Sequence, residues 1–376
     1  MTEPDPSTLQ TLLSLFQQGR YQEMEALANE TTRHFPHDGF GWKALGLALL
    51  QQEKLDEALT PLRRALILSP NDAAIHNYQG NALRRKNQLT AATACFERAM
   101  ELHPDNPEFL NNLGMTLQAR GQPAGAEACY RQVLNLQPDY ANTHFNLGVL
   151  LQQTQRPEEA RSAFHQALRH KPRFPDALFH LGLLLQPTAP VEAENRFRQA
   201  LAIQPDHLPA LGQLGNLLLA QQRLPEAVTA FRAALALRPD LPLVINNLGI
   251  ALQQQNDDQS AEQCFRQAMA LHPNGVDPCY NLGVLLQSRQ RHSEAEAVYR
   301  QVLRLEPDHA QTLVNLGTLY AATERLTEAE AAFKQALLLR PDHADAYYNS
   351  GNLLFGQERF HEAETAYRHA LSIRPV

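Results

Sequence analysis

Asparagine recurs along the chain two residues before a glycine, and this row has the clearest chemical potential in the sequence. An asparagine amide offers a hydrogen-bond donor and an acceptor, so a row of them can pair with the C=O and N–H groups of an extended peptide. The same amides can instead bond a neighbouring helix or only be hydrated, and the sequence favours neither interpretation. The candidate peptide-binding residues are Asn112, Asn146, Asn247, Asn281, Asn315 and Asn349, interrupted by His180 and Gln213.

No motif predicts catalysis, a cofactor or a metal site. The sequence has no HExxH pattern, no CxxC pair and no GxxxxGK loop, which are the common signals of zinc, redox and phosphate sites. Cys95, Cys129 and Cys264 occupy one position of the repeat described below. Packed helices lie roughly 8 to 10 Å apart, which is too far for a disulfide. We expect a non-catalytic protein with free thiols and neither cofactor nor metal.

Charge and composition exclude several classes of partner. A net charge of -7 and a pI near 6.1 argue against a nucleic-acid binder, because phosphate recognition needs clustered Lys and Arg. The amino terminus, "MTEPDPSTLQ", lacks the basic and apolar regions of a secretory signal. No apolar run is long enough to span a bilayer. The sequence therefore predicts a cytoplasmic protein without membrane insertion.

The glycine that follows each asparagine belongs to a series of fixed period. The octapeptide "FNLGVLLQ" from Phe145 returns almost unchanged as "YNLGVLLQ" from Tyr280. Proline, alanine and an aromatic residue keep the same period, as in Pro70, Ala92 and Phe96. The glycines are Gly46, Gly80, Gly114, Gly148, Gly182, Gly215, Gly249, Gly283, Gly317 and Gly351, with steps of 34 residues and one step of 33. Such a period indicates a repeat protein.

Each period predicts two helices. In "PNGVDPCYNLGVLLQSRQRHSEAEAVYRQVLRLE" apolar residues come at helical spacing in two blocks separated by a polar break. We name them helix A and helix B. The small Gly and Ala positions let the two helices approach closely, and the aromatic residue fills the space beside them. The proline ends helix B, and the Asp or Asn after it, as in "PDYA", "PDHA" and "PNDA", is expected to cap the next helix A.

These residues resemble the tetratricopeptide repeat (TPR), which carries Leu-Gly in helix A, Ala and an aromatic in helix B, and a closing Pro. The resemblance implies an all-α solenoid, a right-handed superhelix of about eleven repeats with helix A lining the concave face. Residues 1–38 form a degenerate helix pair, with Leu12 and Met24 in place of Gly and Ala. Residues 39–376 contain ten repeats in one continuous solenoid. Pro187 and Pro190 predict a shortened turn and a local change of superhelix pitch.

The asparagine row also resembles the one in the repeat arm of O-linked GlcNAc transferases, where asparagines hold the substrate backbone. The last repeat, "PDHADAYYNSGNLLFGQERFHEAETAYRHALSIRP", is similar in style. Chaperone-binding repeats grip a terminal carboxylate with a lysine at the second position of helix A, and this chain has none there. Four acids at that position, which we attribute to the helix dipole rather than to a ligand, are Glu108, Asp176, Asp277 and Asp345.

The sequence reaches Val376 at the close of a repeat, without a polar helix to cover the last apolar face. Repeat arrays need such a cap for solubility, so we expect either another chain on this face or a longer protein.

We interpret the chain as a TPR scaffold that binds a protein or an extended peptide, with no catalytic activity. One alternative is the substrate-recognition arm of a glycosyltransferase. The other is a structural protein that assembles into homo-oligomers through the solenoid ends.

Overall fold

The computed structural model describes residues 4–374, so Pro375 and Val376, where the last repeat was predicted to end, lie outside it. The all-α prediction is confirmed, because the described residues form 22 helices and no strand. Eleven repeats of two helices account for that number. The chain divides into two compact units, Met1–Ala189 and Pro190–Val376. The superhelix and the single continuous solenoid stay predictions.

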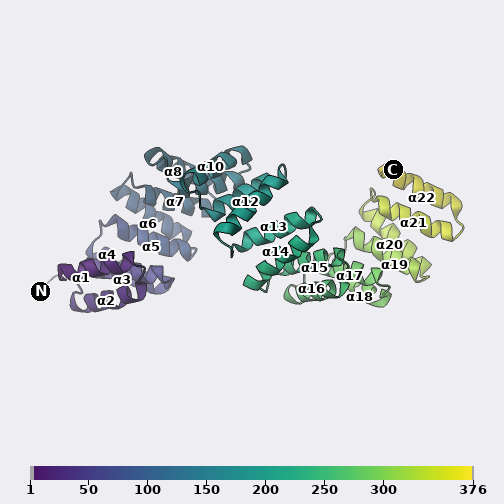
Figure 1. Cartoon of the computed structure of the whole chain (residues 1–376), viewed down its shortest axis with the longest axis horizontal. Helices are drawn as coiled ribbons and strands as arrows, with labels where there is room; N and C mark the ends of the chain where they lie inside the picture. Colours follow the sequence, from purple (N-terminus) through teal and green to yellow (C-terminus); the bar gives the residue numbers. More distant parts are fainter. Residues whose placement is uncertain (1–3, 375–376) are drawn as a thin grey trace. The chain divides into compact units, whose positions relative to one another are not determined.

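Unit 1 is built from successive helices that pack side by side (Figure 1). Odd-numbered helices are helix A of a repeat and even-numbered helices are helix B. They are α1 (Pro6–Gln17), α2 (Tyr21–His34), α3 (Gly39–Gln51), α4 (Leu55–Leu68), α5 (Ala73–Arg85), α6 (Leu89–Leu102), α7 (Pro107–Ala119), α8 (Pro123–Leu136), α9 (Ala141–Gln153), α10 (Pro157–His170) and α11 (Pro175–Leu185).

Unit 2 repeats the arrangement and begins with a helix B. Its helices are α12 (Pro190–Ile203), α13 (Leu208–Ala220), α14 (Leu224–Leu237), α15 (Pro242–Gln254), α16 (Asp258–Leu271), α17 (Val276–Ser288), α18 (His292–Leu305), α19 (Ala310–Ala322), α20 (Leu326–Leu339), α21 (Ala344–Gly356) and α22 (Phe360–Ile373).

Helix A of one repeat contacts helix A of the next as well as both neighbouring B helices. In unit 1, α3, α5, α7 and α9 form such a row, and in unit 2 the row runs from α13 through α15, α17 and α19 to α21. Residues at one repeat position on these helices therefore lie near their equivalents in the next repeat. This packing is what positions the asparagine row.

The periodic glycine and the periodic aromatic residue meet where helix A crosses helix B. A Cβ atom added to Gly148 would lie 2.6 Å from the ring of Phe164, and one added to Gly215 would lie 2.5 Å from the ring of Phe231. Both rings are completely buried. The close approach predicted from the sequence is therefore confirmed, because no larger side chain fits between the two helices.

In most repeats the turn from helix A to helix B contains a left-handed residue. Glu53 has φ 61° and the amide of Lys54 donates to the carbonyl of Leu49 at 3.0 Å, which ends α3 in a Schellman-type turn. Non-glycine residues rarely adopt this conformation. The equivalent residues are Asn87, Gln155, Gln222, Asn256, Gln290, Glu324 and Glu358, whereas Gly19 and Gly121 occupy the turn elsewhere.

The expected capping of helix A holds only in part. Asp72 of "PNDA" accepts from the amide of Ala74 at 2.9 Å. In "PDYA" and "PDHA", however, the residue directly after proline is not the cap, and the prediction is wrong there. The cap lies two residues after the proline, which places Tyr140, His309 and His343 at the helix start. The aspartate in these stretches comes one residue too early.

His343 caps α21 as a neutral ring. Its Nδ1 accepts from the amide of Ala346 at 3.3 Å, and its Nε2 lies 3.0 Å from Oε1 of Gln311. An acceptor at Nδ1 requires that this nitrogen carry no proton. Burial, followed by the nearby charge of Arg340, lowers the pKa of His343 below its ordinary value.

The prediction of a shortened turn near Pro187 is wrong, because the turn from α11 to α12 has four residues (186–189) and the turn from α9 to α10 has three (154–156). The shortening lies in helix A instead. Helix α11 has 11 residues, whereas α9 has 13, and α12 starts at Pro190. The predicted change of pitch stays a prediction, since α11 closes one unit and α12 opens the other.

A matched pair of glycine substitutions on α13 tests the helix-crossing contact. Gly215→Ala is expected to lower the free energy of unfolding by about 1–3 kcal/mol, because the new methyl group clashes with Phe231. Gly212→Ala has nothing within 4 Å of its new Cβ and is expected to stabilise the helix by up to about 1 kcal/mol. Urea unfolding followed by circular dichroism measures both. Equal effects would contradict the assignment.

The histidine cap predicts a pH dependence of stability. Because the folded pKa of His343 is lowered, its contribution is fully present above the ordinary histidine pKa of about 6.5. The contribution is lost as the pH falls from there through the folded pKa. His343→Asp keeps a cap that stays unprotonated in this range, as Asp38 and Asp72 do at the same repeat position. The thermal midpoint of the variant should fall less between pH 7 and pH 5 (about half a unit above that pKa and about one and a half units below it) than that of the unchanged protein. Parallel curves would refute the cap's role.

Candidate functional site

All six predicted asparagines lie on A helices and are partly exposed. Asn112 and Asn146 lie on the adjacent helices α7 and α9 of unit 1. The other four lie on successive A helices of unit 2, from α15 to α21. The row is therefore two rows, one in each unit, and we call these six residues the asparagine ladder. Each member is a rung.

The rungs of unit 1 bond the preceding A helix. Nδ2 of Asn112 donates to Oδ1 of Asn77 at 2.9 Å, and Nδ2 of Asn146 donates to Oδ1 of Asn111 at 3.0 Å. Asn77 and Asn111 are buried, and Oδ1 of Asn111 also accepts from the hydroxyl of Thr143. The hydrogen bond that Nδ2 of each rung donates thus joins two adjacent repeats.

Two rungs of unit 2 behave in the same way. Nδ2 of Asn281 donates to Oδ1 of Asn246 at 2.9 Å, and Nδ2 of Asn247 donates to Oδ1 of Asn216 at 2.8 Å. Oδ1 of Asn247 in turn accepts a weaker hydrogen bond from Asn246 at 3.3 Å. Bonding to a neighbouring helix, one of the interpretations left open by the sequence, is therefore observed in both units.

Asn315 is enclosed by a larger network. Its Nδ2 lies 3.3 Å from the hydroxyls of Tyr280 and Tyr299, and its Oδ1 accepts from Gln311 at 3.4 Å. Gln311 continues the chain to the cap residue His343. The amide of Asn315 is therefore satisfied on both sides within the protein.

The residue 35 positions before each rung decides its partner. That position holds Asn77, Asn111, Asn246 and Tyr280, which are the acceptors described above for four of the six rungs. It holds Gly212 for Asn247, which turns to Asn216 instead. It holds Val314 for Asn349, and the side chain of Asn349 has no hydrogen bond within residues 4–374. At the interruption, Phe145 meets the ring of His180 edge-on at 5.5 Å.

Three rungs retain a carbonyl oxygen that faces solvent. Over the described ranges, Oδ1 of Asn112, Asn146 and Asn281 accepts no hydrogen bond, while Nδ2 of each is held by the preceding helix. None of these oxygens is among the buried polar atoms that lack a partner. The arrangement therefore presents fixed hydrogen-bond acceptors rather than freely rotating amides.

Sequence reasoning missed the acceptors of the ladder. Asn111 and Asn246 stand directly before a rung, so the "NN" doublet was a usable signal. Asn77 belongs to the same repeat position as Asn111, although its neighbour is Tyr78. Aligning the repeats three residues before the glycine would have collected these three and Tyr280, but not Asn216, which follows Gly215.

A second recurring network, also missed, joins consecutive B helices. Arg156 binds Glu159 on its own helix and Glu127 on the preceding helix B, each at 2.7 Å. The hydrogen bond from Arg156 lowers the pKa of Glu127. Such partly exposed pairs contribute little individually, but here they recur. The equivalent arginines are Arg223, Arg291, Arg325 and Arg359.

The described residues give no candidate metal site and no candidate membrane-spanning helix. They contain no group of three or more His, Cys, Asp or Glu that could hold a metal ion. None of the described helices is long and apolar enough to cross a membrane. Cys95, Cys129, Cys264 and Cys279 are free thiols, as predicted for the first three, and burial raises the pKa of each.

Structural similarity to one solved chain supports the repeat fold, and two others are similar at lower TM-scores. A chain of the APC/C heterotetramer Cut9–Hcn1 is 14% identical over 98% of this chain and 87% of that one, with a TM-score of 0.52. Yeast Tom70 is 15% identical over 98% and 92%, with a TM-score of 0.44. Pseudomonas aeruginosa PilF is 23% identical over 55% and 94%, with a TM-score of 0.49. No curated protein matches the sequence significantly.

Family models cover most of the sequence. Tetratricopeptide-repeat models match residues 9–73, 80–121 and 105–173. The model of the cilia and flagella-associated protein 70 C-terminal domain matches residues 180–374, which is more than half of the chain. With the paired helices and the periodic glycine contact, these matches identify the repeat. The chain therefore belongs to the tetratricopeptide repeat family, in which its residues 180–374 fit the model of the cilia and flagella-associated protein 70 C-terminal domain.

Proposed function

We propose that the chain is a non-catalytic scaffold that binds an extended segment of a protein partner along its A helices. The observation that carries the proposal is the set of solvent-facing carbonyl oxygens on Asn112, Asn146 and Asn281, each held in place by its own Nδ2. Fixed acceptors recognise the N–H groups that every peptide carries, so the partner's side chains are not specified by these contacts.

The spacing of the rungs supports an extended partner. Helices that pack together lie about 8 to 10 Å apart, and α7 packs against α9. A polyproline II segment repeats every three residues, which is about 9 Å, and leaves its backbone N–H groups unpaired. Every third N–H of such a segment can therefore face successive rungs. A β-strand, with a repeat of about 7 Å, fits this spacing less well.

The rungs are not equivalent in this proposal. Asn315 has both halves of its amide bonded inside the protein, so we assign it a structural role. Asn247 also has its oxygen and its Nδ2 engaged. The partner's contacts then fall on Asn112 and Asn146 in unit 1 and on Asn281 and Asn349 in unit 2.

Two other functions stay predictions. A substrate-recognition arm of a glycosyltransferase needs a transferase domain in the same or another chain. Homo-oligomerisation through the solenoid ends needs contacts between copies. Homo-oligomerisation does not explain why the acceptors of the ladder are held in one orientation, and a recognition arm would use the ladder as the scaffold does but needs the additional domain, so we favour the binding scaffold.

A peptide-binding assay with matched variants tests the proposal. Phage-displayed random peptides are selected on the intact chain, and the affinity of a selected peptide is then measured by fluorescence polarisation. Replacing Asn112, Asn146 and Asn281 together by Ala should weaken the binding of a peptide held by unit 1 at least about fivefold, since two hydrogen bonds of about 0.5–1.5 kcal/mol each are lost.

The control is the triple replacement of Asn77, Asn111 and Asn246 by Ala. It removes the same helix-to-helix bonds and keeps the rung oxygens but frees them to rotate, so the affinity should fall less than in the rung variant. Circular dichroism confirms that both variants fold. If no peptide is selected, or if the rung variant binds as tightly as the unchanged chain, the ladder is not the binding site.

A further inference from the structure

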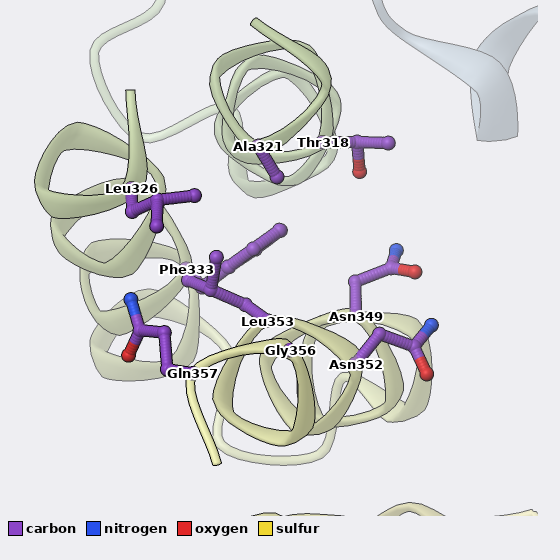
Figure 2. Close-up of a pocket in the computed structure, with 9 residues that line it drawn as sticks. All are labelled: Thr318, Ala321, Leu326, Phe333, Asn349, Asn352, Leu353, Gly356 and Gln357. Atoms are coloured by element: carbon purple, nitrogen blue, oxygen red, sulfur yellow. The ribbon is translucent and has the colours of Figure 1, made fainter. Parts of the chain in front are cut away.

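A cavity of about 300 Å³ opens in unit 2 where α19, α20 and α21 meet (Figure 2). Its apolar part is formed by Leu326, Phe333 and Leu353, with Ala321 opposite them. The amides of Asn349 and Asn352 lie side by side on α21 at its edge, across from Thr318 (Figure 2). Gly356 and Gln357 complete the lining. One side of this cavity is therefore a rung of the ladder.

The cavity exists because two side chains are shorter here than elsewhere in the chain. Four residues after the periodic glycine, helix A carries Gln in α7, α9, α15 and α17, and α19 carries Ala321 instead. Five residues after it, α9 and α15 carry Gln153 and Gln254, α7 carries Ala119 and α21 carries Gly356. The missing long side chain on α19, together with the glycine on α21, leaves the hollow.

The rim of the cavity is polar where several other repeats are apolar, although α5 and α13 also carry asparagine at the same position. The residue directly after the periodic glycine is Val149 in α9 and Val284 in α17, but it is Thr318 in α19 and Asn352 in α21. The hydroxyl of Tyr367 donates to Oδ1 of Asn352 at 2.9 Å. That bond orients the amide and leaves Nδ2 of Asn352 able to donate to a ligand.

Asn349 adds an amide whose donor and acceptor are both available. The position that supplies an acceptor to other rungs holds Val314, which has no polar side-chain atom. No residue within the described part of the chain hydrogen-bonds the side chain of Asn349. A peptide backbone can thus both donate to and accept from this rung, which the bonded rungs do not allow.

We propose that this cavity is a specificity pocket for one large, uncharged side chain of the bound peptide, with Asn349 and Asn352 bonding the backbone on either side of it. This inference rests on the proposed function and names the part of the partner that the ladder alone does not select. None of the nine lining residues is ionisable, so a charged side chain would lose its hydration without compensation. A volume of about 300 Å³ is at the lower limit for ligand pockets, which suits one aromatic side chain.

Fluorine NMR on the intact chain tests the pocket directly. The probe is N-acetyl-para-fluorophenylalanine N-methylamide, which carries one aromatic side chain between two peptide groups. Its resonance should broaden on addition of the unchanged protein, and the capped amide of phenylalanine should compete. The capped amides of lysine and glutamate should not compete, because the lining offers no counter-charge.

Two matched substitutions on α19 locate the binding. Ala321→Gln restores the side chain found at this position in α7, α9, α15 and α17, fills the cavity and should weaken probe binding at least about tenfold (~1.4 kcal/mol). Ala322→Gln makes the same change one residue further on, at an exposed position outside the cavity, and should leave binding unchanged. Circular dichroism verifies the fold of both variants.

Each outcome is decisive. Loss of probe binding in Ala321→Gln alone supports the pocket. Absence of binding to the unchanged chain, or equal binding by both variants, overturns it. The ladder variants Asn112→Ala, Asn146→Ala and Asn281→Ala do not line the cavity. If the ladder variants abolish peptide binding but the probe does not bind the cavity, the proposed function stands and the pocket is refuted. If the probe binds the cavity but the ladder variants leave peptide binding unchanged, only the pocket remains.

Discussion

The structure depends on one steric fact, the absence of a side chain at the periodic glycine of helix A. Because a Cβ atom at Gly215 would lie 2.5 Å from Phe231, the backbone of helix A can rest directly on an aromatic ring of helix B. The contact recurs with Phe or Tyr as the partner at Gly80, Gly114, Gly148, Gly249, Gly283, Gly317 and Gly351. It fixes the distance and rotation between the two helices of a repeat. The direction in which every other residue of helix A points follows from it.

That fixed rotation gives the asparagine ladder its chemistry. Each rung lies against the residue 35 positions earlier, on the preceding helix A. An asparagine or tyrosine there binds the amide donor and directs the oxygen outward or into a network. Where this residue is Gly212, the rung Asn247 donates to another acceptor. Where it is Val314, the amide of the rung has no partner there. One repeated residue thus takes several chemical states without any change in its own type.

Much of the fold follows from the sequence because its determinants are periodic. The glycine, alanine, aromatic and proline positions each predict a feature of one repeat, and the 22 helices agree with them. The prediction of the helix caps was wrong because it placed the cap directly after the proline, whereas the cap directly precedes the first helical residue. In "PDHA" the cap is a histidine. The partners of the rungs depend on contacts between repeats, which a pattern within one repeat does not contain. The arginine network between Arg156 and Glu127 was missed for the same reason.

The pairing rule of the ladder makes the state of a rung a property of the junction between two repeats. A duplication or excision of one whole repeat leaves the contacts within each remaining repeat unchanged. It alters contacts only at the new junction between two repeats. If residues 310–343 were removed, for example, Tyr280 would become the residue 35 positions before Asn349. In the present chain the hydroxyl of Tyr280 accepts from Nδ2 of Asn315. The free rung would become a bonded one although no residue in either remaining repeat had changed. A repeat array of this kind can therefore acquire or lose a recognition element through rearrangement alone, without a point mutation.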